Sequence, residues 1–178
     1  MYVSSSAKKR VVLATWGSFG DLYPFLALAL ELQERGHTAV IATSTLYREA
    51  IEEAGIGFQK VRPELPHPDE EISGEILRSL SHGRKGPEYL FRELLVPHLR
   101  DTYVDMLAAV TGGADLLVSH QVPLAAPLVA EKTGIRWISS VLSPIAFASV
   151  YDPPTPPQFP PLRTLAAIHP LWQKRSSV

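Results

Sequence analysis

The sequence predicts an α/β domain of the Rossmann-like type, in which a mainly parallel sheet lies between two layers of helices. Short apolar runs such as Val-Val-Leu-Ala at 11–14 are typical of strands that are buried on both faces. Between these runs lie longer segments whose apolar residues recur at helical spacing. Glycines and prolines separate the two kinds of segment. The alternation of strand and helix implies right-handed crossovers and therefore parallel strands.

The first strand is expected at Lys8–Thr15, and the remaining elements are arranged around residues 11–36. The glycines at 17 and 20 turn the chain after the first strand, and a helix is predicted over Leu22–Arg35. Asp21 is a candidate N-cap of this helix, and Pro24 is a candidate first-turn proline. This segment therefore predicts the strand, glycine turn and helix with which a βαβ fold begins.

The remaining elements follow in the same rhythm. Strands are expected at His37–Ala42, Gly57–Val61, Asp115–Ser119 and Ile135–Ser139, and helices at Leu46–Ala54, Gly74–Ser81, Glu88–Val110 and Pro123–Lys132. Pro97 is expected to kink or split the long helix. Prolines and carboxylates in Arg62–Ser73 predict a loop, which is either a solvated linker or the lip of a binding pocket. Tyr151–Pro161 is rich in proline and is expected to be extended.

Length and composition restrict the class of protein. The 178 residues suffice for one substantial core, and the net charge of −1 gives no reason to expect nucleic acid or an anionic membrane as partner. The chain has no cysteine, so disulfides and thiolate metal sites are excluded. No apolar run has the length of a signal peptide core or a membrane span. These features predict a soluble cytoplasmic protein.

A dinucleotide site is the first alternative that a glycine turn after a first strand suggests. The turn reads G-S-F-G-D rather than G-x-G-x-x-G, and no carboxylate follows the second strand at 43–45 to hold a ribose. Asp21 would also repel a pyrophosphate at the start of the helix. The sequence therefore disfavours dinucleotide binding.

The segment from Gly17 to Thr43 resembles the start of the GT-B glycosyltransferases, in the branch that holds sterol and glycopeptide glucosyltransferases. The resemblance rests on the glycine–aspartate turn, the long helix and the strand R-G-H-T-A-V. It extends to A-G-I-G-F-Q-K-V at Ala54–Val61 and to V-A-E-K-T-G-I-R-W-I at Val129–Ile138. Phe19 is a departure, because many members of that branch carry an arginine there.

The resemblance implies that residues 1–178 form the N-terminal, acceptor-binding domain of an inverting hexosyltransferase. The donor, a nucleotide-sugar such as a UDP-hexose, would sit mainly on a second domain, which the sequence does not contain. The acceptor would be a hydroxyl of a lipid-like, sterol or polyketide-like compound, and no metal or other cofactor is expected. The chain alone would be inactive. A non-catalytic scaffold module and an α/β enzyme of another kind remain as alternatives.

The residues that follow each strand are the candidates for the site, because ligands of open parallel sheets bind beyond the carboxyl ends of the strands. Asp21 is the only carboxylate among them. The resemblance gives it the role of the general base that takes the proton of the acceptor hydroxyl, and the alternative is a plain helix cap. The candidate acceptor-binding residues are Gly17, Ser18, Phe19, Gly20, His120, Gln121 and Ser143.

For other side chains near the strand ends, the sequence supports a role in the site less strongly than it does for Asp21. His120 is either a partner of the acceptor or Asp21, or a structural histidine. Aromatic residues are expected either near the mouth of the cleft or in the core: Trp16, Phe19, Tyr23, Phe147 and Tyr151. The histidines show no zinc-ligand spacing, and no nucleophile motif occurs. An uncovered cleft in the isolated domain predicts self-association.

Overall fold

The structure is a computed structural model that describes residues 7–82 and 85–143. Contacts divide the chain into Met1–Ser140 and Val141–Val178, and the fold described below is that of the first unit. The proline-rich segment 151–161, Phe147 and Tyr151 lie outside the described residues.

Five parallel strands form one sheet in the order β3-β2-β1-β4-β5. The strands are β1 (Arg10–Ala14), β2 (Thr38–Thr43), β3 (Gly57–Lys60), β4 (Leu116–His120) and β5 (Arg136–Ser140). In the central strand, Ala14 pairs with Ala42 on one side and with Ser119 on the other. This register brings the carboxyl ends of β1, β2 and β4 to the same edge of the sheet.

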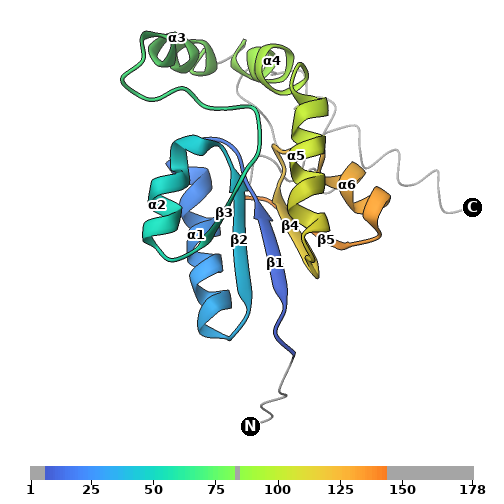
Figure 1. Ribbon diagram of the computed structural model, residues 1–178. Helices are drawn as coiled ribbons and strands as arrows, with labels where there is room; N and C mark the ends of the chain where they lie inside the picture. The colour runs from blue at the N-terminus through green and yellow to red at the C-terminus, as the bar shows by residue number, and fades with distance from the viewer. Residues whose placement is uncertain (1–6, 83–84, 144–178) are drawn as a thin grey trace, which may run out of the picture. The chain divides into compact units, whose positions relative to one another are not determined.

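The helices form the layers that the sequence predicts. They are α1 (Phe19–Glu34), the 3₁₀ turn Thr45–Tyr47, α2 (Arg48–Glu53), α3 (Glu71–Leu80), α4 (Gly86–Tyr89), the π-helical turn Leu90–Leu95, α5 (Leu99–Thr111) and α6 (Ala126–Thr133). Helices α1 and α2 cover one face of the sheet, and α5 and α6 cover the other (Figure 1). Helices α3 and α4 lie beyond the edge at which the strands end (Figure 1).

The core explains why the strands read as apolar runs. Leu13 in β1 and Ile41 in β2 are fully buried, and so is Leu117 in β4. Met106 of α5 and Val129 of α6 pack with the sheet in one apolar cluster. A central strand that is covered by helices on both faces has no solvent-facing positions for polar residues, and its sequence becomes continuously apolar.

The starts of α1 and α3 differ from the prediction. Helix α1 begins at Phe19 rather than at residue 22, because Ser18 is its N-cap. Pro24 therefore lies inside the helix rather than in its first turn, and it cannot donate a bond to the carbonyl of residue 20. Helix α3 begins at Glu71, so the predicted loop ends three residues earlier.

The long helix expected at Glu88–Val110 is interrupted as predicted. A π-helical turn ends at Leu95, and α5 begins at Leu99, so Pro97 falls between two helical segments. Among the helices in the described part of the chain, none combines the length and apolar character that crossing a membrane requires.

Candidate functional site

The turn after β1 has a backbone that requires glycine at one position. Gly17 has φ of 139°, which side-chain-bearing residues rarely adopt. A Cβ atom at this position would also collide with the carboxylate of Asp21. Glycine at 17 therefore permits the turn and leaves the space in which the Asp21 side chain lies.

Asp21 is held by the turn as the third residue of α1. Its Oδ2 accepts hydrogen bonds from the Ser18 backbone N–H at 2.7 Å and from the Ser18 hydroxyl at 3.0 Å. The Ser18 hydroxyl in turn accepts from the Gly20 N–H at 3.2 Å. The pair is a capping box, so the interpretation of Asp21 as the N-cap is wrong. Its other oxygen, Oδ1, faces His120.

His120 lies at the end of β4 and is almost fully buried. Its Nε2 is 3.9 Å from Asp21 Oδ1, which is too far for a direct hydrogen bond. Burial lowers the pKa of His120 and outweighs the nearby Asp21 carboxylate, which acts in the opposite direction. Within the described part of the chain, its buried Nδ1 has no hydrogen-bond partner.

An apolar hollow of 350 Å³ borders this turn. Its lining includes Trp16, Gly17 and Ser18 after β1 together with Leu46 and Tyr47 after β2. The opposite wall comes from the loop after β3 and from α3: Leu65, Pro66, Pro68, Ser73, Gly74, Ile76, Leu77 and Leu80. Four residues of the predicted loop 62–73 thus line the hollow, while residues 67–72 are exposed to solvent, and the choice between a linker and a pocket lip stays a prediction.

Aromatic side chains gather where the turn meets the hollow. The hydroxyl of Tyr47 donates to the Gly17 carbonyl at 2.8 Å. Phe19 packs edge-on against Tyr47, with ring centroids 4.9 Å apart, and stacks on Tyr23 at 5.4 Å. Trp16 is buried and lines the hollow. Burial, reinforced by Asp21 and Tyr23, raises the pKa of Tyr47, so its hydroxyl stays neutral.

A larger and more open hollow of 840 Å³ lies against α5 and α6. It is lined by residues such as Tyr103 and Leu128 and includes none of the predicted site residues. Ligands of parallel α/β sheets bind beyond the carboxyl ends of the strands, which the smaller hollow borders and this one does not. The 350 Å³ hollow is therefore the better candidate for the site.

The structure brings most of the predicted site residues together. Gly17 and Ser18 line the hollow, and Phe19 and Gly20 form the first residues of α1. Gln121 follows His120 and is exposed. Ser143 belongs to Val141–Val178, the second unit, and is not placed relative to the hollow.

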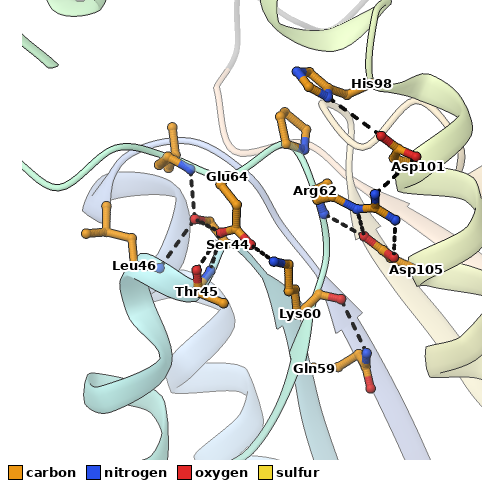
Figure 2. Close-up of polar contacts among 12 residues, drawn as sticks. Ser44, Thr45, Leu46, Gln59, Lys60, Arg62, Glu64, His98, Asp101 and Asp105 are labelled. Carbon is orange, nitrogen blue, oxygen red and sulfur yellow. Dashed lines mark hydrogen bonds and ion pairs between the residues drawn. The ribbon is translucent and has the colours of Figure 1, made fainter. Parts of the chain in front are cut away.

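Sequence reasoning missed a second carboxylate at this edge of the sheet. Glu64 reaches the residues after β2, where its Oε2 accepts hydrogen bonds from Ser44 and Thr45 (Figure 2). Burial raises the pKa of Glu64, but hydrogen bonds from Lys60, Thr45 and Ser44 outweigh it and lower the pKa to about 2. No rule of sequence spacing links residues that are 20 positions apart. The signal in the sequence that could have pointed to Glu64 is therefore its position shortly after a strand.

No group of three or more histidine or carboxylate side chains in residues 7–82 and 85–143 forms a metal-binding set. The prediction that the protein uses no metal or other cofactor stays a prediction.

The fold and the residues beyond the strand ends together define a Rossmann-like α/β domain with a candidate binding site at the carboxyl edge of its sheet. Residues 11–151 match the glycosyltransferase family 28 N-terminal domain, and the chain belongs to this family. The resemblance to GT-B glycosyltransferases is thereby confirmed.

Curated relatives include enzymes that differ in the acceptors their names give. GtfE, a glycosyltransferase of Amycolatopsis orientalis, is 30% identical over 175 residues, which cover 94% of this chain and 39% of GtfE. The O-mycaminosyltylonolide 6-deoxyallosyltransferase of Streptomyces fradiae is 29% identical, over 73% of this chain and 30% of that protein. A sterol 3-beta-glucosyltransferase of Candida albicans is 27% identical, over 78% of this chain and 9% of that protein. The chain thus spans well under half the length of these relatives.

Solved structures show the same fold. The glycosyltransferase SsfS6 of Streptomyces sp. SF2575 superposes with a TM-score of 0.57 at 21% identity, over 75% of this chain and 39% of that one. The glycosyltransferase SnogD of Streptomyces nogalater gives a TM-score of 0.57 at 22% identity, over 78% of this chain and 35% of that one. The Rossmann-like α/β architecture predicted from the sequence is therefore confirmed as one half of the GT-B fold.

Proposed function

We propose that this chain binds the acceptor of a glycosyltransferase in the 350 Å³ hollow and supplies Asp21 as the general base. The observation that carries the proposal is the position of the Asp21 carboxylate. One of its oxygens accepts hydrogen bonds from Ser18, which lines the apolar hollow, and the other faces His120. Within the described residues this second oxygen accepts no hydrogen bond, and a carboxylate in this state, next to a turn that lines the hollow, suits the removal of a proton from a bound hydroxyl.

The proposed reaction is an inverting transfer. The acceptor hydroxyl gives its proton to Asp21 Oδ1 while its oxygen attacks the anomeric carbon of the donor. The bond between that carbon and the phosphate oxygen breaks, and the nucleoside diphosphate leaves with the electron pair. Neutral His120, whose Nε2 is 3.9 Å from Asp21 Oδ1, would hydrogen-bond the same hydroxyl. The donor, a UDP- or other nucleoside diphosphate-hexose, would be held by a second domain, and this chain alone would not transfer sugar.

The hollow indicates the chemical class of the acceptor. Its lining is mostly aliphatic and aromatic, and its volume lies toward the small end of about 300–1,000 Å³ that is usual for ligand sites. A compact apolar ring system with a hydroxyl at one edge fits this lining. Two relatives are named for a sterol and for O-mycaminosyltylonolide as acceptors, which supports an acceptor of this kind. A non-catalytic scaffold remains the second candidate, and it has no use for Asp21 beyond the cap.

The test is Asp21→Asn in a protein that also carries the donor-binding domain. Asparagine keeps an oxygen that can accept from the Ser18 N–H, so the turn is retained while the basic carboxylate is lost. We expect kcat to fall by about 10²–10⁴-fold, the usual contribution of a general base, with the KM for the nucleotide-sugar unchanged.

The matched control is Ser18→Ala, which removes the capping hydroxyl and leaves the carboxylate in place. It should cost about 1 kcal/mol of stability and much less activity than Asp21→Asn. If Asp21→Asn keeps kcat within a few-fold of the unmodified enzyme, Asp21 is only part of the cap and the scaffold interpretation gains.

A further inference from the structure

Four consecutive residues, from Arg62 to Leu65, lead from β3 into the loop that walls the hollow. The first of them is fixed to α5. Arg62 Nε donates to Asp105 Oδ2 at 2.8 Å, and its second guanidinium nitrogen donates to Asp105 Oδ1 at 2.9 Å. The Arg62 carbonyl accepts from the Thr102 hydroxyl at 2.7 Å. A bidentate guanidinium–carboxylate pair fixes the relative orientation of the two side chains as well as the distance between them.

The second residue is tied to the end of β1. The Pro63 carbonyl accepts a buried hydrogen bond of 2.7 Å from the indole N–H of Trp16. Trp16 lines the hollow and directly precedes Gly17. The path of the loop and the position of the catalytic turn are therefore coupled through one side chain.

The third and fourth residues are tied to the end of β2 (Figure 2). Glu64 Oε2 accepts from the Ser44 hydroxyl at 2.9 Å, from the Thr45 N–H at 2.8 Å and from the Thr45 hydroxyl at 2.6 Å. Its Oε1 pairs with Lys60 at 2.7 Å. The fully buried Ser44 hydroxyl also accepts from the Leu65 N–H at 2.9 Å. One carboxylate thus joins both neighbouring strand ends to the start of the pocket wall.

We infer that Glu64 is a positioning residue for the acceptor, because it fixes the wall from Leu65 to Pro68 opposite the turn of Gly17 and Ser18. The inference rests on the proposed function of the hollow. A wall that is already ordered costs no ordering entropy when the acceptor binds. Without the carboxylate, the loop would keep its attachment to α5 through Arg62, but of its hydrogen bonds to the residues after β2 only that from the Leu65 N–H to Ser44 would remain.

The test measures binding of 2-naphthol, a flat apolar ring system with one hydroxyl, to the 178-residue chain by calorimetry and by tryptophan fluorescence. Glu64→Ala should weaken binding about tenfold, because several hydrogen bonds to a charged group are lost together. Thr45→Val removes one of these bonds at an exposed residue and should weaken binding about threefold. Glu64→Gln keeps an accepting oxygen and should recover part of the loss.

Glu52→Ala is the matched control, since Glu52 is a carboxylate on α2 with an exposed ion pair to Arg48. Its binding should equal that of the unmodified chain, and circular dichroism confirms that each variant is folded. In a protein with the donor domain, Glu64→Ala should raise the KM of the acceptor and leave kcat and the KM of the donor unchanged.

If the unmodified chain binds 2-naphthol and both Glu64→Ala and Thr45→Val bind it with the same affinity, Glu64 has no positioning role. If Glu64→Ala does not fold, Thr45→Val decides alone. Failure of the unmodified chain to bind 2-naphthol or any other hydroxyl-bearing apolar ring compound overturns the proposed function instead.

Discussion

At the scale of single residues, the Asp21 side chain has an observed structural role in the capping box and a proposed role as the general base. The capping box engages Oδ2, so the carboxylate is oriented before any ligand arrives. Gly17 contributes by leaving its Cβ position empty for this carboxylate. A base that is already oriented loses little freedom when the acceptor binds, which favours proton transfer. Its place in the capping box, as N3 rather than N-cap, is therefore compatible with the proposed role as base.

The buried His120 predicts a specific dependence of stability on pH. Its pKa is lowered in the folded protein, so below the usual value of 6.5 the unfolded chain takes up a proton that the folded chain does not. The free energy of unfolding should therefore fall as the pH drops from about 6.5 towards the lowered pKa. His120→Gln should flatten the profile in this range, as measured by urea unfolding between pH 5 and 8. An unchanged slope in the variant would show that His120 does not remain neutral in the folded state.

At the scale of elements, the loop after β3 predicts a second and more acidic transition. The pKa of Glu64 is lowered from 4.5 to about 2, so its contribution to stability is complete above pH 4.5 and is lost as the pH falls towards 2. Glu64→Gln should reduce the loss of stability in this window relative to the unmodified chain. Thermal unfolding at several pH values between 2 and 5 measures this loss of stability. We expect Glu52→Gln to leave the dependence of stability on pH unchanged. If Glu64→Gln also showed the same dependence as the unmodified chain, the contacts assigned to Glu64 would be contradicted.

The order and type of the elements could be predicted because local patterns determine them. The Val11–Ala14 run indicates a covered central strand, and Gly36, Gly55 and Gly134 adopt positive φ where helices end. The start of α1 was misplaced because Ser18 and Asp21 are both good capping residues, and the sequence does not say which one begins the helix.

The pocket wall could not be predicted in the same way. The contacts of Glu64 with Ser44 and Thr45 span about 20 positions, and those of Arg62 with Asp105 span 43. They depend on how β2, β3 and α5 are arranged in three dimensions, and a segment rich in proline and carboxylates looks the same whether it is solvated or lines a pocket. The closeness of Asp21 and His120 could be predicted because Asp21 lies just past the turn after β1 and His120 ends β4, which pairs with β1.

At the scale of the whole molecule, exposed apolar side chains and a low net charge predict self-association. Phe19 and Tyr23 are 45% and 58% exposed beside the turn, and the net charge of −1 provides little repulsion. Light scattering over a concentration series should show an average mass that rises above that of one chain. A constant monomer mass, with no binding of an apolar-surface dye, would contradict this prediction.

The central claim is that this domain binds the acceptor and not the nucleotide-sugar. It is tested most directly by recording backbone amide NMR spectra of the chain during titration with 2-naphthol and, separately, with UDP-glucose. We predict that 2-naphthol shifts the amides of Gly17, Ser18 and Leu77, which line the hollow, and that UDP-glucose leaves them in place because Asp21 occupies the start of α1. Shifts of these amides by UDP-glucose alone, or 2-naphthol shifts confined to the hollow beside Tyr103 and Leu128, would contradict the claim.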